Sequence, residues 1–302
     1  MTTPQAAFDS YWRETLDELG RIPMAAESTP IPLRTTDFAT LYGVHLTSIG
    51  PYRIFGYLSV PTAAGPHPAV YFTPSYQSAV QPIPQGASNE LRRHVITFSL
   101  AARGQRNADK PFAAAFPGWL TTGITDPTAY IFRGVVADCL RCLEFLLSRN
   151  DIDSARIAIT GNDLAFITAA LGTGALGKSA THVATAPELF FGMPSQNAAG
   201  ARTEIIDHLR QSPNDKNNIE KTLALYDLRA FAASAPTARL IQAGAPGSEL
   251  DGTALAPLAD SAHAVLRESE QSRYKDGLAL MIWLAEQFGM PDPNVILPAA
   301  WH

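Results

Sequence analysis

The run Arg156–Phe166 constrains the fold more than any other stretch, because a short strand, a glycine-marked turn and a helix follow one another directly. Residues 157–160 are apolar and β-branched, Gly161 marks the turn, and an Ala- and Leu-rich helical stretch begins at Asp163. Alternating strands and helices of this kind favour a mostly parallel, doubly wound α/β sheet. We expect strands at 68–72, 95–100, 157–160, 182–185, 239–243 and 263–267, and helices at 8–19, 129–149, 163–171, 253–262 and 274–288.

The first part of the chain departs from this alternation. Residues 40–48 and 52–60 alternate apolar and polar side chains around Ile49-Gly50-Pro51, which predicts two antiparallel strands. Residues 200–234 are polar and rich in helical patterns, and we predict a helical excursion from the sheet there. The sequence shows neither a repeat nor a linker-like change in composition, so one domain over residues 1–302 is expected.

The charge balance narrows the choice of partners. A net charge of −5 gives no electrostatic reason to expect nucleic acid or an anionic membrane. The longest apolar runs fall short of the ~18–20 residues that cross a bilayer. The first residues have neither the basic nor the apolar region of a secretory signal. We therefore expect a cytoplasmic protein.

Two motifs suggest metal or nucleotide chemistry, and their context argues against both. Cys139 and Cys142 form C-x-x-C inside an amphipathic helix and away from its start, which predicts buried core thiols without metal or redox function. Gly172–Ser179 matches G-x4-G-K-[ST]. A phosphate-binding loop of that kind joins a strand to a following helix, whereas here a helix comes first and a strand follows. We expect no cofactor.

The turn at Gly161 also has the layout of a nucleophile elbow. That motif reads G-x-S-x-G and places the serine nucleophile between a strand and a helix. Here Gly161-Asn162-Asp163-Leu164-Ala165 reads G-x-D-x-A. A carboxyl group therefore stands where a serine hydrolase carries its hydroxyl.

Five further motifs follow one another along most of the chain: Phe8–Trp12, Phe55–Pro61, Arg103-Gly104-Gln105, Gly123–Arg133 and Asp151–Gly161. In this order they resemble the acetyl xylan esterase and cephalosporin C deacetylase family (carbohydrate esterase family seven) of α/β-hydrolases. The resemblance implies an α/β-hydrolase fold and a homo-oligomer. It carries less weight for activity, because function depends on the residues of the site.

By this resemblance, the elements of the family's catalytic site are all replaced. The segment Thr73–Tyr76 stands in place of a His-Gly-Tyr oxyanion turn, and Pro74 has no N–H to donate. The position of the family's acid falls near Gly247, with Glu249 and Asp251 close enough to substitute. The position of its histidine falls on residues 268–271, where Glu270 is the best match.

His263 is the one histidine whose place in the chain order fits a displaced base. It opens its strand, however, and active sites of such sheets lie at the carboxyl ends of the strands. Five strand residues at ~3.3 Å each would leave it roughly 15 Å from the chemistry.

Asp163 allows three interpretations. It can be a carboxylate nucleophile, which needs a histidine to activate water for the second step. It can be a non-catalytic residue retained because aspartate tolerates the positive φ of an elbow. It can also pair with Glu270, because two close carboxylates separate their pKa values into an acid and a base. Such a pair would suit hydrolysis, elimination or cyclisation of a small metabolite, or would bind a cation.

Several residues are expected to follow strands at their carboxyl ends, where they could line a ligand pocket: Ser75, Tyr76, Arg103, Gln105 and Glu188. For Arg103, a scaffold role beside backbone groups or carboxylates is favoured over a role in the pocket. Trp119 could cap the pocket or pack its own loop. Three functions follow from these observations. The first is a divergent family member without serine esterase activity that binds a small organic ligand or a partner. The second is an enzyme that uses Asp163, and the third is a structural subunit that assembles with an active paralogue.

Overall fold

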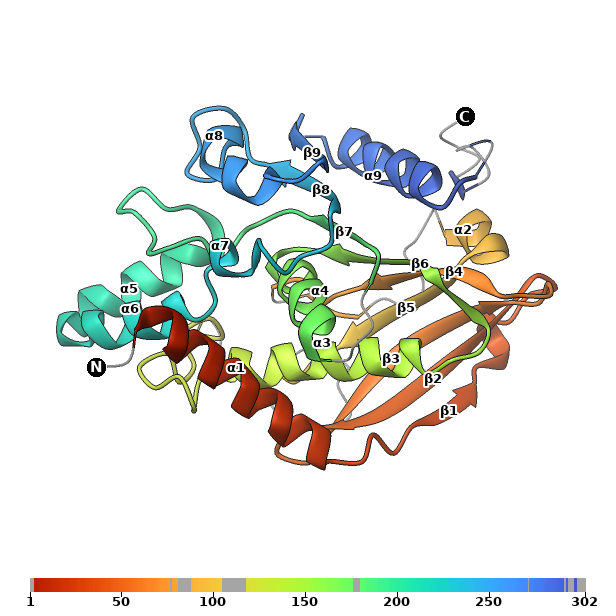
Figure 1. The fold of residues 1–302 in the computed structure, drawn as a ribbon, viewed down its shortest axis with the longest axis horizontal. Helices are drawn as coiled ribbons and strands as arrows, with labels where there is room; N and C mark the ends of the chain where they lie inside the picture. Colours follow the sequence, from red (N-terminus) through yellow and green to blue (C-terminus); the bar gives the residue numbers. More distant parts are fainter. Residues whose placement is uncertain are drawn as a thin grey trace.

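The computed structural model describes residues 3–76, 78–80, 88–104, 118–175, 180–270, 272–290, 292 and 296–297. Within these residues, nine strands form a sheet in the order β1-β2-β3-β5-β4-β6-β7-β8-β9 (Figure 1). The strands are β1 (Glu27–Pro30), β2 (Ala39–Ser48), β3 (Tyr52–Pro61), β4 (His67–Phe72), β5 (Ile96–Ala101), β6 (Ile152–Gly161), β7 (His182–Thr185), β8 (Ala238–Ala243) and β9 (His263–Glu268).

The pairing of neighbouring strands changes once across this sheet, from antiparallel to parallel. The pairs β1–β2, β2–β3 and β3–β5 are antiparallel. Every pair from β5–β4 to β8–β9 is parallel. The predicted mostly parallel sheet with antiparallel strands on its N-terminal side is therefore confirmed. β1 was not expected, because its four residues are all exposed and show no alternation of apolar and polar side chains.

The helices lie between and beside these strands. They are α1 (Pro4–Arg21), α2 (Ser88–His94), α3 (Ile131–Leu147), α4 (Asp163–Ala175), α5 (Thr203–Gln211), α6 (Lys216–Ala224), α7 (Leu228–Phe231), α8 (Gly252–Leu255) and α9 (Arg273–Gln287). Short 3-10 turns are η1 (Pro32–Arg34), η2 (Gly200–Arg202), η3 (Pro213–Asp215) and η4 (Ala256–Ala259). The helix expected over 253–262 is divided into α8 and η4, where Pro257 has no N–H for an α-helical bond.

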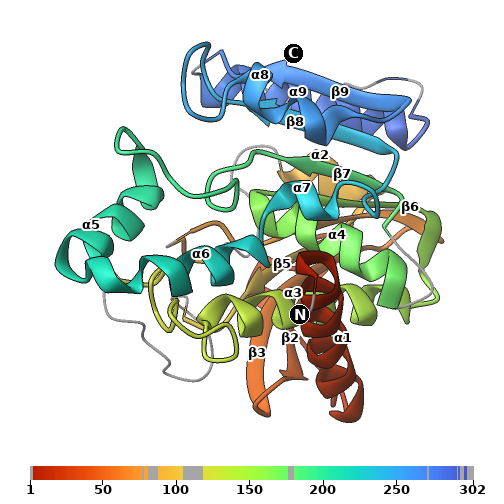
Figure 2. The same ribbon diagram turned by 60° about the vertical axis from the view of Figure 1, so that its left-hand side comes forward.

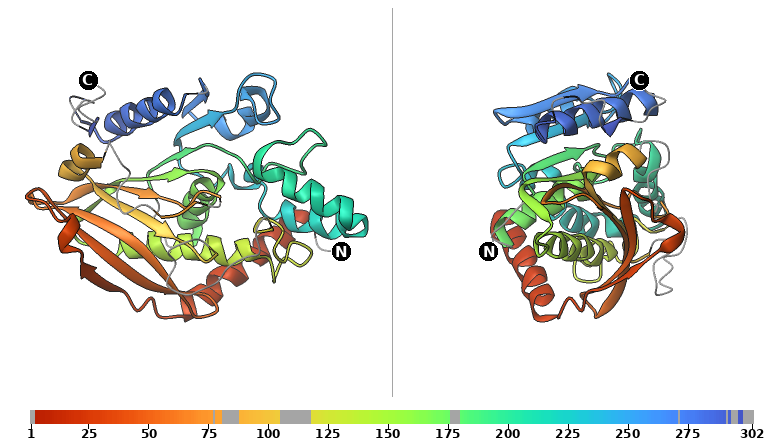
Figure 3. Two further views of the ribbon diagram at one scale, coloured as in Figure 1. Left: turned by 180° about the vertical axis from the view of Figure 1, so that it is seen from behind. Right: turned by 90° about the vertical axis from the view of Figure 1, so that its right-hand side faces the viewer.

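Two apolar cores lie on the two faces of the sheet, as the views in Figures 2 and 3 show. The larger core packs α1, α3, α4 and α7 on one face and contains Trp12, Val135, Phe166 and Phe231. The smaller core places α2 and α9 on the other face. Helices on both faces of a parallel sheet explain why β4 and β7 are buried along almost their whole length.

The two cysteines lie in α3 within the larger core. Cys139 and Cys142 are both fully buried and carry free thiols. Burial raises the pKa of the Cys139 thiol to about 12. The prediction of buried core cysteines is confirmed. Gly172 of the nucleotide-loop motif lies inside α4, whereas Lys178 and Ser179 lie outside the described residues.

The predicted excursion over 200–234 contains η2, α5, η3, α6 and α7. Figures 1 and 3 show α5 and α6 beside the start of α1. Trp12 Nε1 donates to the carbonyl of Leu225 at 2.9 Å, and the hydroxyls of Tyr11 and Tyr226 are 2.6 Å apart. The excursion is therefore anchored to α1 by buried polar contacts.

In the described part of the chain, each helix is too short or too polar to cross a membrane.

Candidate functional site

The elbow turn keeps its strand–glycine–helix form. β6 ends at Gly161 and α4 begins two residues later at Asp163. Gly161 has a φ of 150°, and a Cβ there would lie 2.2 Å from Oγ1 of Thr73, so the tight turn requires glycine. Among the described residues other than glycine, only Ala25 has a positive φ. The expectation that Asp163 sits at positive φ is therefore wrong, because Asp163 is the first residue of a regular helix.

The Asp163 carboxylate is fully buried and binds the backbone after β7. Its Oδ2 accepts the N–H groups of Glu188 and Leu189, each at 2.9 Å. Its Oδ1 accepts the N–H of Phe190 at 2.8 Å. Burial raises the pKa of Asp163, and these hydrogen bonds act in the opposite direction. The side chain thus holds the segment 188–190 in place and exposes no surface to a ligand.

Arg202, which the sequence reasoning did not single out, supplies a positive charge near this carboxylate. Its side chain is 2% exposed and donates to the carbonyls of Phe191 and Gly192 at 3.2–3.3 Å. It also forms an ion pair with Glu249 at 3.4 Å. Burial lowers the pKa of Arg202, whereas Glu249 and Asp163 raise it. Asp163 thus binds residues 188–190 and Arg202 binds the next two residues, Phe191 and Gly192, so that two buried charged side chains hold the segment after β7.

A cavity of about 470 Å³ lies at the carboxyl ends of the strands. Tyr76 follows β4 and Glu188 follows β7, and both line it. We name it the α5 cavity, because most of its wall comes from η2 and α5. Its lining residues are Tyr76, Gly118, Thr121, Glu188, Gly200, Ala201, Thr203, Glu204, Asp207, His208 and Gln211.

Two carboxyl groups, those of Glu204 on α5 and of Glu188 after β7, line the α5 cavity. Glu204 accepts the hydroxyl of Tyr76 through Oε1 and the N–H of Leu120 through Oε2 at 3.1 Å. Glu188 accepts the side-chain amide of Asn162. Burial raises the pKa of both carboxyl groups, and the negative charge of Asp163 raises that of Glu188 further. Each carboxylate therefore lies in a partly desolvated position beside a space large enough for a ligand.

His208 completes the polar wall of the α5 cavity. Its Nε2 lies 2.9 Å from Oδ2 of Asp215 in η3, which fixes the orientation of the imidazole ring. His208 and Glu204 lie four positions apart on α5 and therefore share a face of that helix. Sequence reasoning set His208 aside because it does not follow a strand; the signal that points to it is this shared helical face.

A family model for acetyl xylan esterases (AXE1) matches residues 2–245. The chain belongs to the acetyl xylan esterase family. The acetyl esterase Axe7A of Xylanibacter ruminicola is 25% identical over 237 residues, which are 74% of this chain and 53% of Axe7A. The chain thus spans about half the length of that curated relative.

Solved structures of acetyl xylan esterases have the same fold. The enzyme from Paenibacillus sp. R4 superposes with a TM-score of 0.76 at 21% identity, covering 92% of this chain and 94% of that chain. Acetyl xylan esterase 1 from Thermoanaerobacterium sp. JW/SL YS485 gives a TM-score of 0.73 at 20% identity, covering 93% of each chain. The predicted α/β-hydrolase fold is confirmed.

Within this family framework, the structure does not bring Asp163 and Glu270 together. Asp163 follows β6 and Glu270 follows β9, and β7 and β8 lie between them. Three strand spacings of ~4.8 Å separate the two positions by about 14 Å. Glu270 is exposed and pairs with Arg267 at 3.0 Å and Lys275 at 2.6 Å. Lys275 and Arg267 lower the pKa of Glu270, and Asp163 is not among the groups that shift it.

Glu249 and Asp251, the two candidates for the family's catalytic acid, both bind structural partners. Glu249 accepts the N–H of Ser195 at 2.7 Å in addition to its contact with Arg202. Asp251 caps α8 and accepts the N–H of Ala254 at 3.0 Å. His263 is exposed at the start of β9, as expected from its place in the sequence.

The other predicted pocket residues divide into two groups. Trp119 lies behind Tyr76, with ring centroids 5.2 Å apart, and supports the wall of the α5 cavity. Arg103 lies at a different cavity and binds the buried Asp138 with both ends of its guanidinium, so it has a structural role. Ser75 is absent from the residues lining the α5 cavity, and Gln105 lies outside the described residues.

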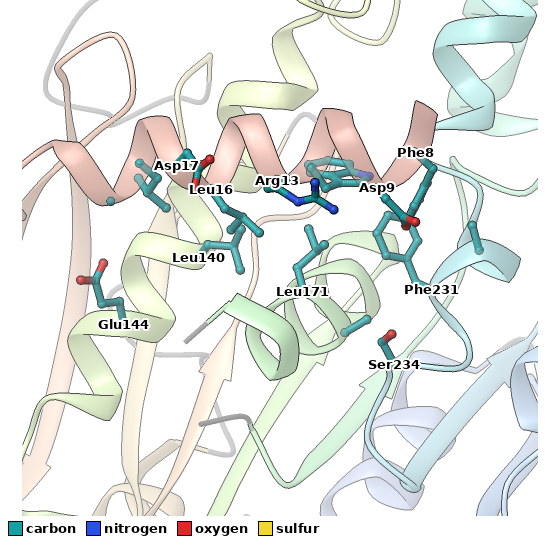
Figure 4. A pocket seen from close by; sticks show the side chains of 15 residues that line it. Phe8, Asp9, Arg13, Leu16, Asp17, Leu140, Glu144, Leu171, Phe231 and Ser234 are labelled. Atoms are coloured by element: carbon teal, nitrogen blue, oxygen red, sulfur yellow. The ribbon is translucent and has the colours of Figure 1, made fainter. Parts of the chain in front are cut away.

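Two larger cavities lie beside α1. Figure 4 shows one of about 500 Å³ between α1 and the helices α3, α4 and α7, with an apolar floor and charged side chains at its rim. The other, of about 1010 Å³, lies between α1 and α6. Neither contains residues from the carboxyl ends of the strands, where α/β sheets bind ligands.

Within the described residues, His, Cys, Asp and Glu do not gather in a group of three or more that would bind a metal.

Proposed function

We propose that this member of the acetyl xylan esterase family is not a serine esterase and binds a small organic ligand in the α5 cavity. The observation that carries the proposal is the state of Asp163. At the position of the nucleophile, the chain has a fully buried carboxylate whose two oxygens accept three backbone N–H groups. A nucleophile must instead reach its substrate and meet a general base.

The placement of the histidines among the described residues supports the same conclusion. All the described hydrogen-bond donors to the Asp163 side chain are backbone groups. His208 binds Asp215, and His263 lies at the opposite end of its strand. The family match ends at residue 245, before the positions at which the acid and the histidine were sought.

A second function, in which Asp163 forms a covalent intermediate, has weaker support. The carboxylate has no exposed surface, and Glu270 has its own cationic partners. Mass spectrometry after incubation with epoxides, haloacids or lactones tests this function, with Asp163→Asn as the control. A mass increase on Asp163 would establish it.

The proposal is tested with a fluorophosphonate probe and a set of acetyl esters, using an active acetyl xylan esterase in parallel. We expect no labelled serine and no hydrolysis above the rate without protein. The Asp163→Ser variant is expected to remain inactive as well, because the described hydrogen-bond partners of residue 163 are backbone groups and include no histidine that would take the proton of the hydroxyl. A labelled serine in the wild-type chain, or hydrolysis that the probe abolishes, would refute the proposal.

A further inference from the structure

The charge of the α5 cavity is one-sided. Of its described lining residues, Glu188, Glu204 and Asp207 carry negative charge, and none is a lysine or an arginine. Asp207 is exposed and pairs with Arg210 at 2.8 Å, so its charge is balanced at the rim. Glu188 and Glu204 are half-buried, and both place a carboxyl group on the described lining of the cavity.

Glu188 is a half-buried carboxylate in a negative environment. Its described side-chain partner is the neutral amide of Asn162, and the nearest charge acting on it is the carboxylate of Asp163. Among the described ion pairs, none includes Glu188. Partial burial of a charge without an opposite charge is costly, and a bound cation would remove that cost.

An aromatic wall stands beside Glu204. The Tyr76 ring lines the cavity, its hydroxyl donates to Glu204, and Trp119 packs behind it. The hydrogen bond and the packing fix the orientation of the ring. An aromatic ring attracts a cation placed over its face, most strongly where water is excluded.

We infer that the ligand of the α5 cavity is a small organic cation, an amine or quaternary ammonium compound, held by Glu188, Glu204 and the ring of Tyr76. This inference rests on the proposed ligand-binding function and names the class of ligand. A cavity of about 470 Å³ has the size of ordinary small-molecule sites. The described residues offer no three-ligand group for a metal ion, which favours an organic cation.

The decisive comparison uses the wild-type chain and three probes of similar size. Benzyltrimethylammonium chloride, benzyl alcohol and sodium benzoate differ in charge and share the aromatic ring. Calorimetric titration is expected to show saturable binding of the ammonium probe alone, with an affinity that falls as salt screens the carboxylates. Equal binding of benzyl alcohol, preferred binding of benzoate, or no saturable binding of the cation up to roughly 10 mM would overturn the inference.

Variants locate the site. Glu188→Gln and Glu204→Gln are each expected to weaken binding of the ammonium probe at least tenfold, because each removes a charge-assisted contact with the cation. Glu286→Gln is the matched control, because Glu286 is exposed on α9, on the other face of the sheet. Unchanged binding in both cavity variants would place the cation elsewhere and refute the inference. The three-probe comparison remains decisive if a variant does not fold.

The outcomes for the two proposals can be separated. Labelling of a serine by the fluorophosphonate probe refutes the non-esterase proposal whatever the cavity binds. Failure of the ammonium probe with no labelled serine refutes only the cationic nature of the ligand.

Discussion

Replacing Asp163 by serine, the residue that the nucleophile elbow calls for, is expected to weaken the fold without creating an esterase. The carboxylate accepts three backbone N–H groups at 2.8–2.9 Å. A serine side chain ends one bond earlier and carries one oxygen, which can accept two hydrogen bonds at most and cannot take the place of both carboxylate oxygens. At least one N–H group would then lack a partner at a fully buried position.

The size of the effect follows from this count. A buried donor without a partner costs about 1–3 kcal/mol, so one or two of them cost about 1–6 kcal/mol. Removal of the buried carboxylate offsets part of this loss of stability, because burial disfavours the charged form of the carboxylate. We expect a net loss of about 2–4 kcal/mol, a large share of the ~5–15 kcal/mol typical of folded proteins.

Urea unfolding at neutral pH measures the loss, and Asp251→Ser is the matched control. Asp251 caps α8 at an exposed site, and serine caps helices about as well as aspartate, so the control is expected to lose less than about 1 kcal/mol. An Asp163→Ser variant as stable as the wild-type chain would refute the view that the carboxylate anchors residues 188–190. Acetyl ester hydrolysis by the variant would show that a general base lies within reach of residue 163.

Three further predictions concern neighbouring groups. Glu188→Gln should stabilise the fold near neutral pH. The pKa of Glu188 is raised in the folded state, so the stability of the wild-type chain rises as the pH falls through that pKa. The advantage of the Gln variant should therefore shrink in acid, which denaturant midpoints measured across pH will show. Asp138→Ala should cost about 3–5 kcal/mol by leaving Arg103 without its buried partner, yet should leave ammonium binding unchanged in any fraction that folds. Cys139 and Cys142 should react with a thiol reagent only after unfolding, because both are fully buried; rapid labelling of the native chain would contradict this.

Much of the fold follows from local patterns in the sequence. β7 begins and ends where the alternation of strands and helices predicted, and β2 and β3 follow the apolar–polar alternation of 40–48 and 52–60 closely. β1 could not be predicted in this way. Its residues are polar and exposed, and pairing with β2 makes them a strand without a contribution from burial.

The site was predicted where it depends on strand ends and missed where it depends on packing. Tyr76 and Glu188 follow parallel strands, so their presence in one cavity follows from the rule that the carboxyl ends of such strands meet. The pairing of Asp163 with Glu270 failed, because the order of strands in the sheet separates β6 from β9. Glu204 and His208 lie on a helix that packs over the cavity, and helical periodicity alone does not say which face it turns inward.

The arrangement around Asp163 suggests why a carboxylate occupies this turn. The three N–H groups that it binds belong to the segment that carries Glu188 into the α5 cavity, and Arg202, at the start of the excursion that bears Glu204, lies near its charge. A single buried side chain therefore positions parts of both acidic walls. A neutral residue at 163 would also remove the charge that raises the pKa of Glu188. If the cavity binds a cation, Asp163 acts as a positioning residue, and Asp163→Asn should weaken ammonium binding more than it changes the folded fraction. If ammonium binding and the folded fraction fall by the same factor, Asp163 contributes to stability alone.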